Sequence, residues 1–314
     1  MFILGCTSQT ENKEEVTSTT SAKGMQSVQV FTADNIDGDI TTKTIESVFE
    51  SSGLTIDANR NLNLMFTKTF NNTHHKVYNL ALFKNTDLNL KLLKKYPNFG
   101  AMVPLTMSIW SDGSTMNIAT LSLEGMARAG EILSDDEDLL AYFTMIDKAL
   151  QSAMPEGTYK NLNGARKFSK KSFSTKFDVA VVLDGGSTLN TYKEDFQEEL
   201  EEELDNLGFL IPNYMNLREE VFDEVKYEAY DFYDTYSICK LDLIYSISKL
   251  HPEVGAYAPC SFYMYKKKDE DTMHMGFLSV ENWITTLGIE DEQSIKELRD
   301  AQAIIESILT QMTE

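Results

Sequence analysis

The chain lacks most of the features that identify a protein's function. It has no stretch of about 18 apolar residues, so no segment is expected to cross a membrane as a helix. Basic residues are scarce: 28 Lys and Arg stand against 49 Asp and Glu, which gives a formal net charge of −21. Such a surface repels phosphate backbones and argues against nucleic acid as a partner. No glycine-rich phosphate loop, Ser/His/Asp order or cluster of catalytic carboxylates is found, so nothing indicates an enzyme.

Cysteine is also scarce, with three residues in 314. The first, Cys6, ends the apolar stretch MFILGC, which resembles the end of a bacterial lipoprotein signal. A complete signal also has a basic start and a longer apolar region, both missing here, and the alternative is an ordinary apolar N-terminus. Residues 7–24 are rich in Ser, Thr, Glu and Lys and are expected to form a flexible tether.

A lipid on Cys6 would place the protein in the bacterial cell envelope, facing the periplasm, with the lipid as its sole attachment to the membrane. The resemblance to lipoproteins implies the outer membrane, because Thr7 rather than Asp follows the cysteine. It would also explain the odd cysteine count, since two cysteines would remain.

Residues 45–110 and 200–265 repeat one pattern at an offset of 155 residues. The identical pairs include Gly53 and Gly208, Asn61 and Asn216, Tyr78 and Tyr233, Pro97 and Pro252, Gly100 and Gly255, and Pro104 and Pro259. We therefore expect a signal remnant and tether (1–24), a first repeat (25–155), a linker (156–172) and a second repeat (173–314), packed as an intramolecular pseudo-dimer. Where the second repeat has Cys239 and Cys260, the first has Lys84 and Leu105. Any chemistry is therefore expected in the second repeat.

Both repeats are predicted to contain alternating strands and amphipathic helices. The first has predicted strands at 26–32, 62–69, 76–83, 101–110 and 115–121 and helices at 40–52, 87–96 and 136–154. The second has strands at 178–183, 209–215, 225–238, 255–265 and 272–278 and helices at 191–207, 240–250 and 291–312. This pattern predicts an α+β fold with a mostly antiparallel sheet and helices on one face.

The stretch from Cys239 to Cys260 resembles the domain of unknown function 302 family. Its members have a cysteine at a strand-to-helix junction, then Pro-Glu-x-Gly, then Pro-Cys at the start of a strand. Here these are Cys239, PEVG at 252–255 and PC at 259–260, although Lys-Leu replaces the family's Asn-Pro after the first cysteine. The first repeat keeps PNFG at 97–100 and Pro104 but neither cysteine. The resemblance implies a TATA-binding-protein-like fold for both repeats and no established activity.

The cysteine pair has three main interpretations, and a further role, such as that of a nucleophile, is left open. A helix of about ten residues leads away from Cys239 for about 15 Å, and a strand of about five residues returns about 16 Å to Cys260, so the two should lie level. They could form a structural disulfide, or two buried thiols that pack as small apolar groups. They could also form a redox or metal-binding pair, with His251 as a third ligand for Zn or Cu.

Two further candidates lie near the cysteines. His274, between Met273 and Met275, could help to capture a soft metal, although these residues could also simply fill the core. An aromatic strand face could bind a small hydrophobic ligand. Its residues are Tyr230, Phe232 and Tyr236 on one strand and Tyr263 and Tyr265 on the next hairpin. We thus expect a non-enzymatic envelope lipoprotein that binds a small molecule or an envelope protein, with a thiol redox or Zn/Cu-binding protein as the alternative.

Overall fold

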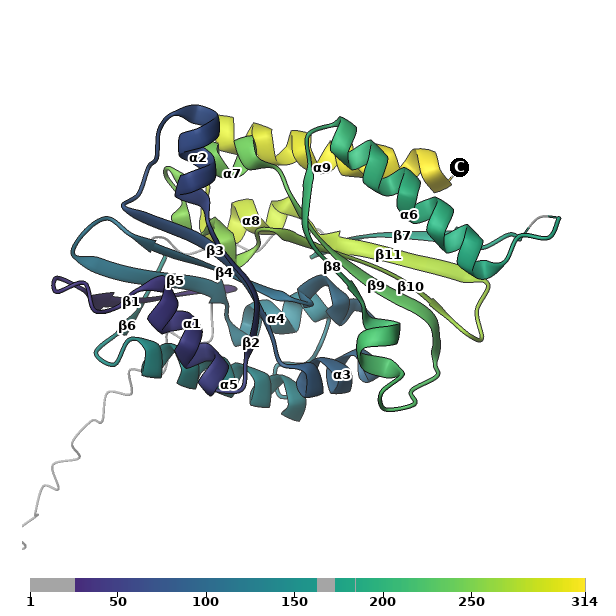
Figure 1. Cartoon of the computed structure of the whole chain (residues 1–314), viewed down its shortest axis with the longest axis horizontal. Coiled ribbons are helices and arrows are strands. Elements are labelled where there is room, and N and C mark those ends of the chain that lie inside the picture. Colours follow the sequence, from purple (N-terminus) through teal and green to yellow (C-terminus); the bar gives the residue numbers. More distant parts are fainter. Residues whose placement is uncertain (1–25, 163–172, 184, 314) are drawn as a thin grey trace, which may run out of the picture.

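A computed structural model describes residues 26–162, 173–183 and 185–313 of the protein. Cys6, the predicted tether and residues 163–172 of the predicted linker lie outside the described residues. Two antiparallel sheets occupy the centre, and helices cover their outer faces (Figure 1). This arrangement confirms the predicted α+β class. No helix in the described part is long and apolar enough to cross a membrane.

The first half forms a six-stranded sheet in the order β2-β3-β4-β5-β1-β6, and all neighbours pair antiparallel. Its strands are β1 (Val28–Asp34), β2 (Thr55–Asn61), β3 (Val77–Lys84), β4 (Leu105–Ser111), β5 (Thr115–Leu121) and β6 (Thr158–Lys160). Its helices are α1 (Thr42–Ser51), α2 (Leu62–Phe70), α3 (Thr86–Lys95), the 3₁₀ helix η2 (Pro97–Met102), α4 (Leu123–Gly130) and α5 (Glu137–Ala153).

The second half forms a five-stranded antiparallel sheet in the order β7-β11-β10-β9-β8. Its strands are β7 (Ser174–Ala180), β8 (Leu210–Asn216), β9 (Tyr230–Cys239), β10 (Cys260–Lys267) and β11 (Thr272–Leu278). Its helices are α6 (Leu189–Asn206), the π-helix η3 (Arg218–Phe222), α7 (Leu241–Ser248), the 3₁₀ helix η4 (Pro252–Ala256), α8 (Val280–Leu287) and α9 (Glu292–Thr313). Apart from β6, each element of the first half has a counterpart here in the same order.

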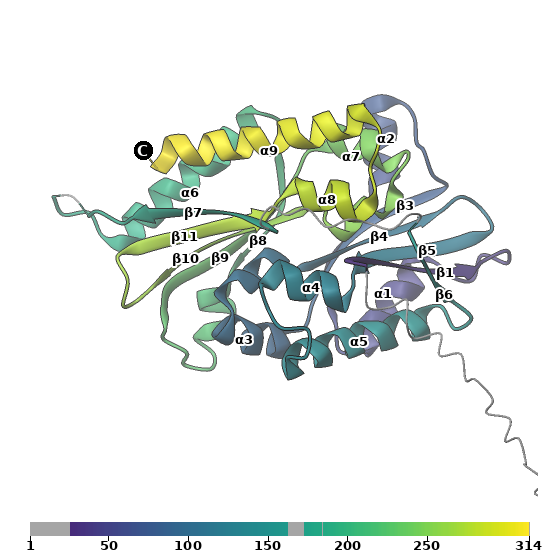
Figure 2. The ribbon, with the colours of Figure 1, turned by 180° about the vertical axis from the view of Figure 1, so that it is seen from behind.

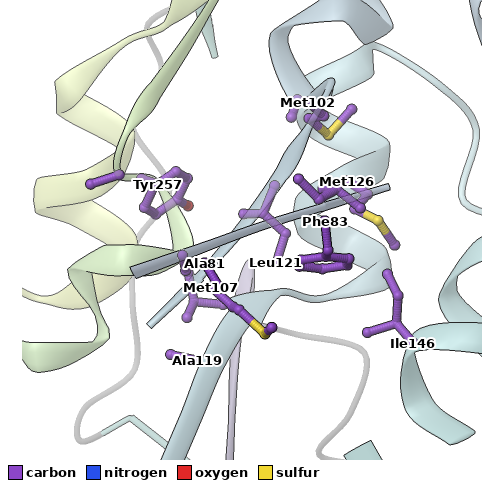
Figure 3. Packing of buried hydrophobic residues seen from close by; sticks show 14 of the residues in the cluster. Ala81, Phe83, Met102, Met107, Ala119, Leu121, Met126, Ile146 and Tyr257 are labelled. Carbon is purple, nitrogen blue, oxygen red and sulfur yellow. The ribbon is translucent and has the colours of Figure 1, made fainter. Parts of the chain in front are cut away.

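The sheets lie between two outer layers of helices. Figures 1 and 2 show α6 and α9 on one side of the molecule and α1 and α5 on the other. The larger cluster of buried apolar residues spans both halves: it includes Phe83 and Ile146 of the first half and Tyr257 of the second (Figure 3). A smaller cluster fills the space between the second sheet and helices α6 and α9. The halves therefore share most of one core.

Each half places a short segment on the sheet of the other half. Segment η2 of the first half packs on β10, and the Tyr233 hydroxyl of the second sheet donates a hydrogen bond to the carbonyl oxygen of Pro97. In the matching exchange, η4 packs on β4, and the Tyr78 hydroxyl donates to the carbonyl oxygen of Pro252 at 3.3 Å. The repeated tyrosines and prolines thus occupy equivalent places in one reciprocal interface.

A glycine permits the close approach in each exchange. A Cβ atom at Gly100 would lie 2.9 Å from the Cβ of Tyr263, across the interface. A Cβ atom at Gly255 would lie 2.8 Å from the backbone nitrogen of Ser108. Real Cβ atoms do not approach other atoms this closely without displacing them, so any larger residue would push the two halves apart.

The structure differs from the predicted local structure at several places. Residues 62–70 form helix α2 rather than a strand, because the Asn61 side chain caps the backbone N–H of Asn63 at 3.0 Å and Leu62 and Phe66 bury one helical face. Two short helices, α4 and α8, follow the hairpins and have no sequence prediction. Residues 158–160 of the predicted linker form β6, which pairs with β1.

Candidate functional site

The two cysteines lie where neighbouring strands end and begin, at the last residue of β9 and the first of β10. Cys260 pairs with Ile238 across the ladder, one residue before Cys239. Because successive side chains alternate between the faces of a sheet, this register puts the two cysteine side chains on opposite faces. In the structure both are free thiols. The path lengths placed them level, and in the structure they are two separate thiols at the ends of neighbouring strands.

The two cysteines are half-buried, and their surroundings are apolar. Both residues line a cavity of about 40 Å³ together with Trp283 and Phe209. Burial raises the pKa of each thiol to about 12, and the nearby Asp242 carboxylate adds to the effect at Cys239. Both groups are therefore protonated thiols at neutral pH, the form that is poor as a nucleophile or a metal ligand.

The histidine candidates lie apart from this cavity. His251 is absent from its lining and instead faces Glu253 at 3.5 Å and Asp291 at 3.6 Å. His274 has Nδ1 at 2.6 Å from an Asp178 oxygen and Nε2 at 2.7 Å from a Glu270 oxygen, so neither nitrogen offers a free lone pair to a metal. Among the described residues, no group of three or more His, Cys, Asp and Glu is placed to hold a metal ion.

The predicted aromatic ligand face is buried, and its residues point to two sides of the sheet. A bulge between Lys266 and Lys267 shifts the register at Tyr230. Strand alternation already separates Phe232 and Tyr236 from Tyr263 and Tyr265, and the bulge puts Tyr230 on the side of Tyr263 and Tyr265. Phe232 and Tyr236 belong to the cluster under α6 and α9, whereas Tyr230, Tyr263 and Tyr265 belong to the core shared with the first half. All five are at most 6% exposed. They are not an open ligand face.

Contacts with the first half explain the burial of the tyrosines. The Tyr263 hydroxyl donates to Asn98 Oδ1 at 3.0 Å, and the Tyr230 hydroxyl donates to the carbonyl oxygen of Leu93 at 3.2 Å. The Tyr233 and Tyr265 rings stack with centroids 5.2 Å apart beside them. These side chains form the interface between the halves, which a single repeat considered alone does not reveal.

A concave site with a volume of about 480 Å³ lies between the two halves. The first half contributes β1, the β4–β5 hairpin and the chain from β6 to Leu162. The second half contributes the loop from α7 to η4 and the end of α8. We call this site the inter-half cleft. Its lining includes Val30, Trp110, Asp112, Asn117, Lys160, Leu250, His251, Glu253 and Glu290.

The first-half wall is held by a small hydrogen-bond network. The Oδ1 atom of Asn117 accepts from the Thr32 hydroxyl at 2.7 Å and from Lys160 Nζ at 3.4 Å, and Nδ2 donates to the Trp110 carbonyl at 3.3 Å. Lys160 reaches the cleft because β6 pairs with β1, where it lies opposite Val30. The sequence assigned Lys160 to a linker, a solvated connector with a binding patch of basic residues as the less favoured alternative.

The second-half wall begins where α7 ends. His75 of the first half fixes this end: one ring nitrogen lies 2.7 Å from the Ser248 carbonyl oxygen and the other 2.7 Å from Asp112. His251 follows and lies between Glu253 and Asp291. Burial acts to raise the pKa of the Asp291 carboxyl, but hydrogen bonds from Ser294 and the nearby His251 outweigh it, and that pKa lies below its usual value.

The cleft is polar and mainly acidic. Asp112, Glu253 and Glu290 supply three carboxylates, and Lys160 is the one Lys or Arg in its described lining. It offers an aromatic wall, several hydrogen-bonding groups and no nucleophile paired with a base. This arrangement suits binding and orientation of a small molecule.

The second half matches a known family. Residues 187–312 match the family described as "Domain of unknown function DUF302". These residues form a DUF302 domain. A solved structure described as "Crystal structure of uncharacterized conserved protein DUF302 from Bacillus stearothermophilus" is 17% identical, with a TM-score of 0.37, and the alignment covers 46% of this chain and 100% of that one. No curated protein matches the chain.

The DUF302 domain contains both cysteines and one wall of the inter-half cleft. That wall comes from its residues 250–253, 287–288 and 290, so it lies inside the matched range. The opposite wall, with Trp110, Asn117 and Lys160, comes from the first half, which lies outside the match. The cleft therefore exists only where the DUF302 domain meets the first half.

Proposed function

We propose that this chain is a non-enzymatic binding protein that holds a small ligand in the inter-half cleft. The volume of about 480 Å³ is the observation that supports this function most directly. Small-ligand sites span about 300–1,000 Å³ and combine apolar or aromatic walls with a few polar groups. The cleft has this composition, with Trp110, Val30 and Leu250 beside Asn117 and Glu253.

The proposal includes a tandem pair of DUF302-type domains. Support comes from the repeated sequence, the common order of elements and the reciprocal docking of η2 and η4. It also includes lipidation at Cys6 and a place in the bacterial cell envelope, for which the support is the N-terminal sequence. In this setting the ligand would be a small molecule that reaches the envelope.

The cleft can be tested by filling its mouth. Leu250 lines the cleft and is 62% exposed, so Leu250→Trp adds bulk there with little cost to the core. The parent would be the full chain with Cys6→Ser, and thermal shift would be measured with a panel of amines, amino acids, carboxylates and sugars. We expect at least one class to raise the melting temperature of the parent, and Leu250→Trp to abolish that rise.

The matched control is Leu133→Trp, because Leu133 is 75% exposed and does not line the cleft. It should respond to the panel as the parent does. Stabilisation that survives Leu250→Trp, or a panel without any effect on the parent, would count against ligand binding in the cleft.

The alternative function is thiol redox chemistry or Zn/Cu binding at Cys239 and Cys260. A pKa raised from 9.0 to about 12 lowers the thiolate fraction at pH 8 by about 1,000-fold. In the Cys6→Ser protein we expect both thiols to react with a thiolate-selective reagent about 1,000 times more slowly than in the unfolded chain. The rate should rise as the pH approaches 12. Fast labelling at pH 8, or one bound metal ion per chain after purification without chelator, would favour the alternative.

A further inference from the structure

We infer that the apolar cavity beside Cys239 and Cys260 is a ligand site of its own, for a small neutral molecule with an apolar body and one hydrogen-bond acceptor. The cavity has a volume of about 40 Å³ and is lined from strands β9, β10 and β11 and helices α7, α8 and α9. It shares no lining residue with the inter-half cleft, so the inference does not depend on the proposed function.

The indole N–H of Trp283 is the observation that points to a ligand. Trp283 lines the cavity from α8 and is 4% exposed, and its Nε1 atom is buried without a hydrogen-bond acceptor among the described residues. The Tyr257 ring stacks on the indole with the centroids 5.5 Å apart and holds its orientation. Because buried indole N–H groups usually have an acceptor, the wall of this cavity contains a fixed donor that lacks its partner.

The lining cannot supply the missing acceptor. Its one side-chain oxygen is Gln302 Oε1, which already accepts from the Val280 N–H at 2.7 Å. The cysteine sulfurs are weak acceptors, and most of the other lining side chains are aliphatic or aromatic. A buried water molecule needs about two to four polar partners, which this lining does not offer. An apolar molecule with a single acceptor atom matches both the walls and the donor.

The first half has apolar side chains at the corresponding positions. Leu105 begins β4 as Cys260 begins β10, and Met126 is the fourth residue of α4 as Trp283 is of α8. Both first-half side chains are at most 1% exposed and have no N–H or O–H group. Apolar bulk alone therefore suffices to pack this part of the fold. The DUF302 domain instead combines a smaller side chain with a buried donor.

The size of the cavity limits the ligand to a few non-hydrogen atoms. A buried water molecule needs about 10–15 Å³, so about 40 Å³ has room for about three atoms of that size. Lys240, Leu243 and Ala301 also line a neighbouring hollow of about 220 Å³, which the exposed Asp242 and Asp300 border. The ligand would enter the cavity from this hollow.

The experiment compares acetonitrile, propyne and acetate, which are similar in size. Acetonitrile is neutral and has one acceptor nitrogen, propyne has nearly the same shape without that acceptor, and acetate is charged. Each would be titrated into the isotope-labelled full chain with Cys6→Ser, whose two tryptophans give two indole N–H signals in NMR spectra. Acetonitrile should move the Trp283 signal downfield to saturation, because the proton gains an acceptor. Propyne should bind without this downfield movement, and acetate should not bind.

Trp283→Phe removes the donor and keeps an aromatic ring. It should weaken acetonitrile binding relative to propyne binding by about fivefold, the effect of losing one hydrogen bond. Both affinities would be read from isoleucine methyl signals, because Ile238, Ile244 and Ile305 line the cavity. The matched control is Trp110→Phe, the same change at a residue that does not line this cavity. It should leave the ratio of affinities unchanged, and it assigns the two indole signals.

Cys260→Leu introduces the residue that begins β4 in the first half. The larger side chain should fill the cavity and abolish the binding of both acetonitrile and propyne. If this variant does not fold, shown by the loss of its dispersed NMR signals, Ala301→Leu replaces it and fills the cavity from α9.

Each other outcome would overturn a stated part of the inference. Binding that survives the filling variant, or no binding of any probe, would overturn the site. A Trp283 signal that stays in place at saturating acetonitrile, an equal loss of acetonitrile and propyne binding in Trp283→Phe, or tighter binding of acetate would overturn the ligand class. The inter-half cleft is tested separately by Leu250→Trp.

Discussion

Where the second half buries Asp234 against Lys193, the first half has Asn79. Asn79 donates a hydrogen bond to Asn59 at 2.8 Å, and the counterpart of Asn59 in the second half is Tyr214, which donates to Asp234 at 2.9 Å. The same two backbone positions therefore hold a neutral pair in one half and a charged network in the other. Asp234 is fully buried, and Lys193 Nζ lies 2.8 Å from its second oxygen.

The difference follows from the length of one helix. Helix α6 has 18 residues and its counterpart α1 has 10, and Lys193 is in the part of α6 that α1 lacks. Burial raises the pKa of Asp234, while Lys193 and Tyr214 lower it by favouring the charged form. A buried carboxylate at this position thus depends on a helix long enough to place a lysine beside it. The half with the shorter helix has an amide side chain at the same position.

The largest effect should come from removing that cation. Lys193→Met leaves Asp234 buried without a cationic partner and should lower the free energy of unfolding by about 3–5 kcal/mol. The pKa of Asp234, already raised, rises further, so its folded state binds a proton more tightly than the unfolded chain. The variant should therefore gain stability as the pH falls from 7 toward 5, which chemical denaturation at each pH would show.

The double variant Lys193→Met/Asp234→Asn is the control, because it recreates the neutral pair of the first half. It should recover most of the loss and remove its pH dependence. If the single variant is as stable as the parent at pH 7, the buried charge is not held by Lys193.

The reciprocal glycines should give the next largest effect. Gly255→Ala meets backbone and should cost about 3 kcal/mol, while Gly100→Ala meets the Tyr233 and Tyr263 side chains and should cost about 2 kcal/mol. Gly38→Ala is the control: that glycine has a φ of +77° but open space around it, so about 1 kcal/mol of backbone strain is expected. Urea unfolding of the three variants measures the difference. Equal losses of unfolding free energy in all three variants would mean that the close approach of the halves does not make Gly100 and Gly255 harder to replace than Gly38.

The sequence predicted the fold better than the site. The 155-residue repeat agrees with the common order of elements in the two halves, and alternation located most strands. Residues 62–70 were misassigned because the short stretch LNLMF fits the apolar spacing of a strand and of a helix. The Asn61 cap favours the helix. Short, glycine-containing helices such as α4 have too few turns to show a clear period.

The site was harder to predict because its residues meet only through the interface. The aromatic face was inferred from one repeat alone. The sequence of one repeat predicts neither the bulge near Lys267 nor the packing of η2 on β10. The cleft brings together segments as distant as Val30 and Glu290, and one of its walls comes from a stretch assigned to a linker. Helix and strand lengths predicted that the cysteines lie level. The face of the sheet on which each side chain lies depends on the strand register, which the number of residues between them does not determine.

The exchange of η2 and η4 also affects how the molecule can change over time. In a dimer of identical subunits every substitution appears twice, once on each side of the symmetry axis. Here both sides are encoded separately in one chain, and their association does not weaken on dilution. One side can therefore lose its cysteines or acquire a buried ion pair while the other keeps its own. Natural selection can therefore change the two walls of an interface such as the cleft independently, one residue at a time.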